Sequence, residues 1–293
     1  MATLAKAPYP GKRVHEFHAE AYVFSADLEQ PLQEKVRPQA KVKLAEGVHY
    51  EYRQADPFRL EGILSYRSGY TQVAGHRSSK PGHGFATLST SVLEGFNVLD
   101  VLTADRIVAQ ISTEHPLDGA VPEVSFLGTR FDNLRISGHK VEIDADLDII
   151  GPKPDEDESY FDQDGVLNRM STQYKNLSTA KGLPEWAIER FPRDHEGWRR
   201  HDNNHDELHC SLVNNLATRG SFGHVINIPH FGKIFLAELK VRRDKARGPK
   251  DYDAYTFHLT MIRMELGCPA VGSGSAGSAT NNGTGSGSGT GNR

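Results

Sequence analysis

Apolar and acidic residues alternate without interruption in one segment of the chain, residues 139–150. In an extended strand, successive side chains point to opposite faces of the sheet, whereas a helix would scatter both kinds of residue around its circumference. One face would carry the apolar members, which are Val141, Ile143, Ala145, Leu147 and Ile149. The other would carry the carboxylates of Glu142, Asp144, Asp146 and Asp148. The pattern predicts a half-buried β-strand whose acidic face is solvated and discourages edge-to-edge association.

The same two-residue period recurs along most of the chain. Alternating runs separated by Gly and Pro occur at 17–24, 40–44, 48–52, 61–67, 70–76, 84–93, 105–113 and 123–127. Residues 224–228 and 233–241 are joined by Pro229-His-Phe-Gly232, which is typical of a β-hairpin, and 255–266 predicts a last strand. We therefore expect an all-β core, sandwich or barrel-like, of about ten or more strands.

Two segments break this pattern. Residues 151–207 are polar, contain both tryptophans, and predict helices at 166–177 and 184–191. We expect a single domain whose β-rich parts are 1–150 and 208–269, with 151–207 as a partly helical insertion and the first place to look for a site. Residues 270–293 consist almost wholly of small and polar residues, which predicts a disordered tail.

The composition argues against two classes of partner. The formal net charge is −4 at pH 7, so the chain has no global basic field that would attract nucleic acid or anionic lipid. No apolar run approaches the ~20 residues of a membrane-spanning helix. The N-terminal residues lack the apolar core of a signal peptide, so we expect a cytoplasmic protein in which Cys210 and Cys268 are buried thiols.

Histidines recur at every fourth position near the end of the insertion. On a helix, His201, His205 and His209 would share one face, where two of them could bind zinc with His195 and Asp206 as further donors. A zinc-bound water would make the protein a metal-dependent hydrolase. However, two consecutive asparagines disfavour a helix, and the residues after His205 alternate like a strand with His209 pointing outward. The H-E-x-x-H signature is also absent, so a solvated polar loop is the leading expectation.

An acidic segment precedes Gly165 and raises the question of calcium. Its oxygen donors are Asp155, Asp157, Asp162 and Asp164. An EF-hand loop with this glycine at its sixth position would begin at Tyr160 and end at Ser171, and neither residue supplies the required carboxylate. A looser calcium site is the alternative, and the leading expectation is that the chain holds neither zinc nor calcium.

Three stretches together resemble a known family. They are Asn97-Val-Leu-Asp-Val-Leu-Thr-Ala-Asp-Arg106, Phe131-Asp-Asn-Leu-Arg-Ile-Ser-Gly-His-Lys-Val141 and Ile226-Asn-Ile-Pro-His-Phe-Gly-Lys-Ile-Phe-Leu236. Their order is similar to that in the β-rich domains of bacterial choice-of-anchor surface proteins. The resemblance implies a structural or adhesive role and brings no catalytic residues.

Nucleophile-elbow, Walker and dinucleotide-binding motifs are missing from the sequence. The leading prediction is a non-enzymatic structural or protein-interaction domain, whose partners are other proteins or copies of itself in a homo-oligomer, met through exposed strand edges or through the insertion. One alternative is the metal-dependent hydrolase. The other is a carbohydrate- or ligand-binding β-sandwich in which Trp186 and Trp198 line a groove.

Overall fold

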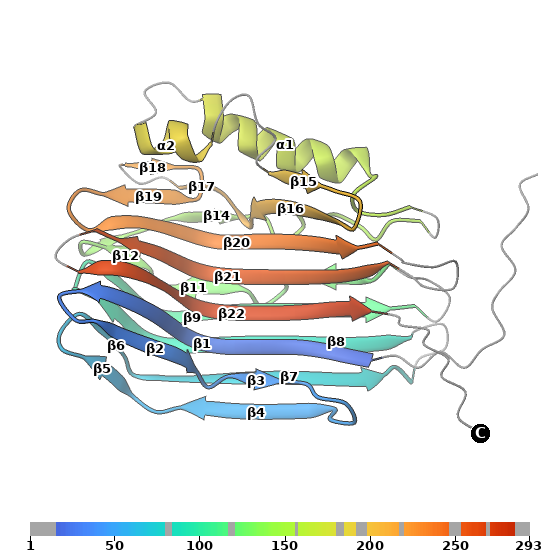
Figure 1. Ribbon diagram of the computed structural model, residues 1–293, viewed down its shortest axis with the longest axis horizontal. Coiled ribbons are helices and arrows are strands. Elements are labelled where there is room, and N and C mark those ends of the chain that lie inside the picture. The colour runs from blue at the N-terminus through green and yellow to red at the C-terminus, as the bar shows by residue number, and fades with distance from the viewer. Residues whose placement is uncertain are drawn as a thin grey trace, which may run out of the picture.

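The protein is a sandwich of two antiparallel β-sheets with two helices at one end (Figure 1). The computed structural model describes residues 16–79, 84–116, 121–155, 158–179, 185–191, 198–216, 220–245, 253–267 and 270–284. The all-β core and its small helical insertion confirm the predicted fold class.

The first sheet has ten strands. Its main path is β15 (Arg199–His201), β16 (His205–Ser211), β20 (Gly232–Asp244), β21 (Ala254–Leu266), β22 (Val271–Thr284), β1 (Glu16–Gln30) and β2 (Glu34–Gln39). Three short strands complete it: β3 (Val42–Lys43) pairs with β1, and β18 (Ser221–Phe222) pairs with β19 (Val225–Ile228), which pairs with β20. The predicted hairpin of β19 and β20 and the strand predicted over 255–266, β21, are both present, although β21 is followed by a further strand, β22.

The second sheet also has ten strands. Its main path is β13 (His139–Lys140), β12 (Arg135–Ile136), β9 (Leu102–His115), β8 (Phe85–Val98), β6 (Leu64–Tyr66) and β5 (Phe58–Leu60). The strands β10 (Glu123–Ser125) and β11 (Arg130–Asp132) pair with β9, whereas β7 (Ser68–Arg77) pairs with β8 and β4 (Tyr50–Ala55) pairs with β7. A separate two-stranded sheet joins β14 (Ile143–Ala145) to β17 (Val213–Leu216).

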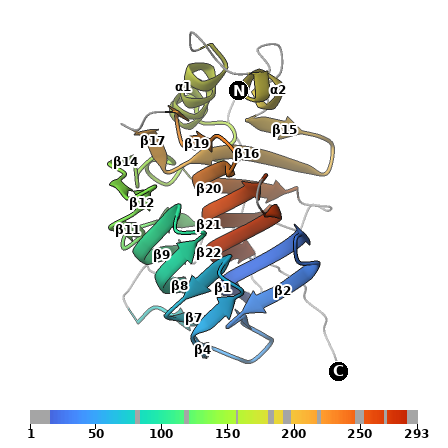
Figure 2. The same cartoon turned by 90° about the vertical axis from the view of Figure 1, so that its left-hand side faces the viewer.

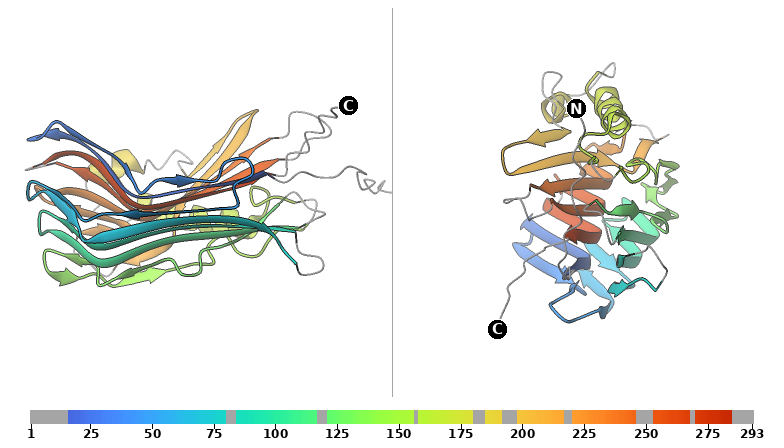
Figure 3. Two further views of the ribbon diagram at one scale, coloured as in Figure 1. Left: turned by 90° about the horizontal axis from the view of Figure 1, so that it is seen from below. Right: turned by 90° about the vertical axis from the view of Figure 1, so that its right-hand side faces the viewer.

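The hydrophobic core lies between the two large sheets, which Figures 2 and 3 show as two stacked layers. Phe24 on β1 packs against Phe96 on β8, with ring centroids 5.9 Å apart. Leu93 and Ile107 from the second sheet and Leu259 from the first are all completely buried. The alternation read in the sequence therefore reflects one face of each sheet turned toward the other.

The insertion forms two helices, α1 (Asp164–Thr179) and α2 (Glu185–Arg190), as predicted. The helix α1 buries Val166, Met170 and Leu177. Neither helix is long and apolar enough to cross a membrane. Part of the predicted insertion belongs to the sandwich itself, because β15 and the start of β16 extend the first sheet at its edge.

The expected disordered tail is replaced over most of its length by a central strand. Residues Val271–Thr284 form β22, which pairs with β21 on one side and with β1 on the other, whereas residues 285–293 lie outside the described part of the chain. Ala276, Ala279 and Asn281 are completely buried. The physical reason is that both neighbouring strands satisfy the backbone of β22, which offsets the weak strand preference of its glycines and serines.

Small residues allow the sheets to approach closely around β22. At Gly277, where φ is +64°, a β-carbon would lie 3.2 Å from the Ile107 side chain of the opposite sheet. Asn281 Nδ2 crosses between the sheets and donates to the carbonyls of Thr87 (3.1 Å) and Ile111 (2.9 Å). Facing sheets usually lie ~10 Å apart, so direct bonds between a short side chain and the opposite backbone require a narrower interface here.

The predicted single strand over 139–150 is a second point of difference. Only β13 and β14 are extended there, and residues 147–150 form turns. Asp146 Oδ1 accepts a hydrogen bond from the Asp148 backbone N–H (3.0 Å), and Asp148 O accepts one from the Gly151 N–H (2.7 Å). Short acidic side chains compete for backbone donors in this way and favour turns over strands. The carboxylates are at the surface, but they do not share one strand face.

Replacing the inter-sheet amide tests the importance of β22. We expect Asn281→Ala to lower the free energy of unfolding by about 1–3 kcal/mol, because it removes two buried hydrogen bonds. Urea unfolding measures the change. Asn203→Ala, at an exposed turn, is the matched control and should change stability by no more than ~0.5 kcal/mol. Equal effects of the two substitutions would contradict a buried role for Asn281.

Candidate functional site

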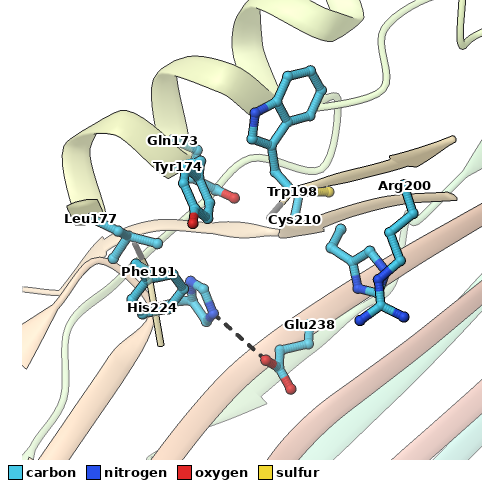
Figure 4. A pocket seen from close by; sticks show the side chains of 10 residues that line it. Gln173, Tyr174, Leu177, Phe191, Trp198, Arg200, Cys210, His224 and Glu238 are labelled. Atoms are coloured by element: carbon cyan, nitrogen blue, oxygen red, sulfur yellow. Dashed lines mark ion pairs between the residues drawn. The ribbon is translucent and has the colours of Figure 1, made fainter. Parts of the chain in front are cut away.

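A pocket of about 260 Å³ lies where α1, α2 and the first sheet meet (Figure 4). It is lined by Gln173, Tyr174, Leu177, Phe191, Trp198, Arg200, His209, Cys210, His224 and Glu238. These residues come from α1, the segments beside α2 and β15, and the strands β15, β16 and β20, together with the residue before β19. The sheet edge and the helices thus bring together residues far apart in sequence.

A buried amide fixes α1 against the edge of the sheet. Gln173 Nε2 donates to Ser211 O and Gln173 Oε1 accepts from Ser211 N, each at 2.9 Å. The side-chain amide therefore pairs with the end of β16 as a neighbouring strand would. This contact holds the helical wall of the pocket at a set distance from its floor.

Aromatic side chains form one wall of the pocket. Tyr174 and Phe191 pack edge to face, with ring centroids 5.9 Å apart, and Phe191 packs edge to face on the imidazole of His224 at 6.4 Å. Trp198 is largely buried. Its carbonyl accepts a hydrogen bond from His209 N (2.7 Å), which extends the pairing of β15 with β16 at the end away from their turn. The wall is apolar, as ligand-binding pockets usually are.

A carboxylate lies opposite the helical wall. Glu238 accepts two hydrogen bonds from Arg263, at 2.5 and 3.1 Å, and its Oε1 lies 3.8 Å from His224 Nε2, the ion pair drawn in Figure 4. Burial alone would raise the pKa of Glu238. The interactions with His224 and Arg263 outweigh it and lower that pKa from 4.5 to about 2. Glu238 is therefore ionised and held in a fixed position at neutral pH.

Two imidazole nitrogens in the pocket lack hydrogen-bond partners within the described part of the chain. They are Nδ1 of His224, a residue with 6% of its surface exposed, and Nε2 of His209, which lies 3.5 Å from Glu207 Oε2 without a hydrogen bond between them. Burial lowers the pKa of His209, although the Glu207 carboxylate opposes the shift, so its ring is neutral at pH 7. A buried polar atom without a partner costs free energy, so both atoms favour a polar group in the pocket.

Cys210 contributes a thiol that is poorly suited to nucleophilic chemistry. It is a free, buried cysteine, and burial raises its pKa to about 12. The reactive form of cysteine is the thiolate, which is scarce at neutral pH under these conditions. Cys268 lies outside the described residues.

The predicted zinc cluster does not form on a helix. His201 ends β15 and His205 begins β16, so the histidines lie on a hairpin, where His205 and His209 share a face. Each of these two has its Nε2 3.5 Å from an oxygen of Glu207, which also contacts Lys240 Nζ. The strand prediction for His209, pointing outward between buried neighbours, is confirmed.

The guanidinium of Arg243 lies between a residue of the predicted zinc site and a residue of the predicted calcium site. Asp206 from the zinc motif is fully buried and accepts from Arg243 Nε (2.9 Å), and it also contacts Lys245 Nζ at 3.2 Å and His201 Nδ1. Asp162 from the calcium motif accepts from Arg243 Nη1 at 3.2 Å. Burial opposes ionisation of Asp206, but its hydrogen bonds with Arg243 and Lys245 lower its pKa. These acidic residues stabilise the fold through cationic side chains.

The remaining predicted site residues have separate positions. No group of three or more potential ligands with metal-site geometry occurs in the part of the chain that the structure describes. Asp155 lies before α1, and Asp164 is its first residue. His195 and Asp157 fall outside the described residues. The Trp186 side chain likewise lies outside the described part of the chain, whereas Trp198 is one of the residues that line the pocket.

Among the lining residues that were not singled out from the sequence are Arg200, His224 and Glu238. One signal could have indicated Glu238, which interrupts the apolar run Ile234-Phe-Leu-Ala-Glu-Leu239 on a strand that is otherwise buried. A charge in such a run requires a partner, and here the partner is Arg263 on β21. Arg200 and His224 carry no comparable signal.

The low pKa of Glu238 predicts a pH-dependent contribution to stability. A carboxylate whose pKa falls on folding stabilises the protein above its unfolded pKa, and the contribution is lost as pH falls from 4.5 toward 2. Between pH 6 and pH 3, we expect wild type to lose about 2 kcal/mol more than Glu238→Gln in urea unfolding. Glu265 contacts the same arginine, Arg263, but is more exposed than Glu238. The control variant Glu265→Gln should therefore lose stability with falling pH as wild type does. Parallel pH profiles for wild type and Glu238→Gln would contradict the assignment.

Comparison with known proteins identifies a family without assigning an activity. No curated protein and no solved structure matches the chain. A family model described as "Domain of unknown function (DUF8256)" matches residues 15–242, which include every lining residue of the pocket and more than half of the chain. The resemblance to choice-of-anchor domains stays a prediction. The chain belongs to the DUF8256 family.

Proposed function

We propose that this protein binds a small, neutral, hydroxyl-rich molecule, of the size and chemistry of a monosaccharide, in the pocket between α1 and the first sheet. The observation that carries the proposal is the buried Nδ1 of His224, without a partner among the described residues, beside a fixed carboxylate and an aromatic wall. A hydroxyl group of a ligand would satisfy this nitrogen.

The polar groups suit a ligand that both donates and accepts hydrogen bonds. The Glu238 carboxylate can only accept, the exposed Arg200 guanidinium can only donate, and the neutral imidazole of His209 can do either. Hydroxyl groups match all three. An anionic ligand would be attracted by Arg200 but repelled by Glu238, which is why a neutral ligand is favoured.

The apolar wall and the volume limit the size of the ligand. Trp198 and Tyr174 offer ring surfaces that can contact the C–H groups of a sugar ring. The volume of about 260 Å³ is slightly below the range of ~300–1,000 Å³ that is typical of sites for drug-sized ligands. A single sugar ring fits this description better than an extended chain.

Binding without turnover is the role that we infer. Cys210 contributes a thiol to the pocket lining, and its raised pKa keeps it protonated. A binding domain also agrees with the leading sequence prediction of a non-enzymatic protein.

The test is a titration of the intact protein with glucose, galactose, mannose, xylose and N-acetylglucosamine. In a Trp186→Phe background, Trp198 is the remaining tryptophan, so we expect at least one sugar to change its fluorescence and to raise the midpoint of thermal unfolding. Arg200→Ala should weaken the binding of that sugar by about tenfold, because a hydrogen bond to a charged group is lost.

Two comparisons make the test decisive. Ile188→Ala, at an exposed position of α2 away from the pocket lining, should bind the sugar like the parent protein. Acetate and benzoate serve as anionic probes. The proposal would be overturned if the protein bound acetate or benzoate but none of the sugars, or if it bound neither class of probe.

A further inference from the structure

The edges of the two large sheets differ in how well they are protected against pairing with another chain. Among the described strands, most edge strands have only two or three residues, as in β3, β5, β13, β15 and β18. The exceptions are β2 and β4, with six residues each. Long edge strands present unpaired backbone groups, and most proteins block them.

Only one of these two longer edges contains a proline and a lysine. The strand β2 contains Lys35 and Pro38, the residue types that most discourage edge pairing. The strand β4 reads Tyr-Glu-Tyr-Arg-Gln-Ala and contains neither proline nor lysine. It lies at the lower margin of the sandwich in Figure 1, paired with β7 on one side.

The hydrogen bonds to β7 show which backbone groups of β4 face outward. Gly75 N donates to His49 O at 2.8 Å, in the same register that pairs Glu51 with Val73 and Arg53 with Thr71. Bonded residues alternate along an antiparallel strand, so the odd-numbered residues direct their N–H and C=O groups to β7. The even-numbered residues, Tyr50, Tyr52 and Gln54, therefore direct theirs to the open edge.

The same residues leave aromatic surface exposed beside this edge. Tyr50 and Tyr52 have 56% and 48% of their surface exposed, which makes them two of the most exposed large hydrophobic residues described. The ring of Tyr52 lies on that of Tyr70 in β7, at 5.8 Å between centroids, so it is held against the sheet. An exposed, ordered aromatic pair at a sheet edge is typical of an interaction surface.

We propose that β4 pairs with β4 of a second copy of this chain, antiparallel about a twofold axis, with Tyr52 opposite the partner's Tyr52. The outward backbone groups then form hydrogen-bonded pairs between the two copies of Tyr52 and between Tyr50 and the partner's Gln54. A twofold interface of this kind is closed and generates a dimer.

Charge complementarity favours this register over its neighbours. It places Glu51 opposite the partner's Arg53 and Arg53 opposite the partner's Glu51, at positions where facing side chains lie closest. Shifting the centre to Tyr50 puts Glu51 opposite the partner's His49 and Arg53 opposite the partner's Gly47. Within one chain, Arg53 Nη2 lies 3.6 Å from Glu51 Oε1 on the same strand face. The four charges of the two copies would therefore form one network in the dimer.

The first experiment is sedimentation equilibrium of the full chain over a wide concentration range. A single short edge buries little surface, so we expect a weak dimer that dissociates on dilution. Glu51→Arg should weaken the dimer by about tenfold or more, because it sets cations opposite the partner's Arg53. The double variant Glu51→Arg, Arg53→Glu restores complementarity and should restore the dimer. Arg37→Glu on β2 is the control and should leave it unchanged.

The second experiment tests the register by disulfide formation. Facing residues of a hydrogen-bonded antiparallel pair have Cα atoms ~5.5 Å apart, within the range that a disulfide spans. Tyr52→Cys should therefore give a covalent dimer under mild oxidation. Tyr50→Cys, equally exposed but opposite the partner's Gln54, should not.

Three results would overturn the proposal. They are a monomer at all concentrations, a dimer that is insensitive to the charge exchange, and equal cross-linking of the two cysteine variants. The last two would place the contact on another surface of the chain.

Discussion

The fold depends on close packing around a strand that has almost no side-chain bulk. The strand β22 lies between β21 and β1, and its Ala, Ser and Gly residues meet β8 and β9 of the opposite sheet. Because these side chains are small, hydroxyls and amides reach from one sheet to the backbone of the other. Ser89 and Ser91 donate to Glu20 O and Tyr22 O, each at 2.9 Å, which adds to the bonds made by Asn281. Larger residues at these positions would separate the sheets and break the contacts.

The candidate site depends on the same sheet at its other end. The strands β16 and β20 continue the first sheet beyond β21, and their edge supports α1 through Gln173. The pocket is therefore built on strands and covered by a helix, with Glu238 on β20 and His224 directly before β19. The cluster around Arg243 stabilises the far end of β16 and β20, so the acidic and histidine-rich motifs contribute to the scaffold of the site.

The sequence predicts the parts of this fold in which side-chain alternation and strand pairing agree. The β19–β20 hairpin and β21 follow from period-two patterns, and α1 follows from its apolar stripe. The strand β22 could not be predicted, because its composition has the low strand preference of a flexible linker and its stability comes from two partners remote in sequence. Of the residues that line the candidate pocket, Trp198 and His209 stood out in the sequence as residue types, but Arg200, His224 and Glu238 become neighbours only through sheet pairing.

Native-state hydrogen exchange tests most directly whether β22 is a core strand. If β22 holds the two sheets together, its amide protons are protected to the same free energy as those of β21, close to that of global unfolding. The exchange is read by mass spectrometry on peptides that cover 254–266 and 271–284. Exchange of the second peptide as fast as that of an unfolded chain, with the first still protected, would contradict the account.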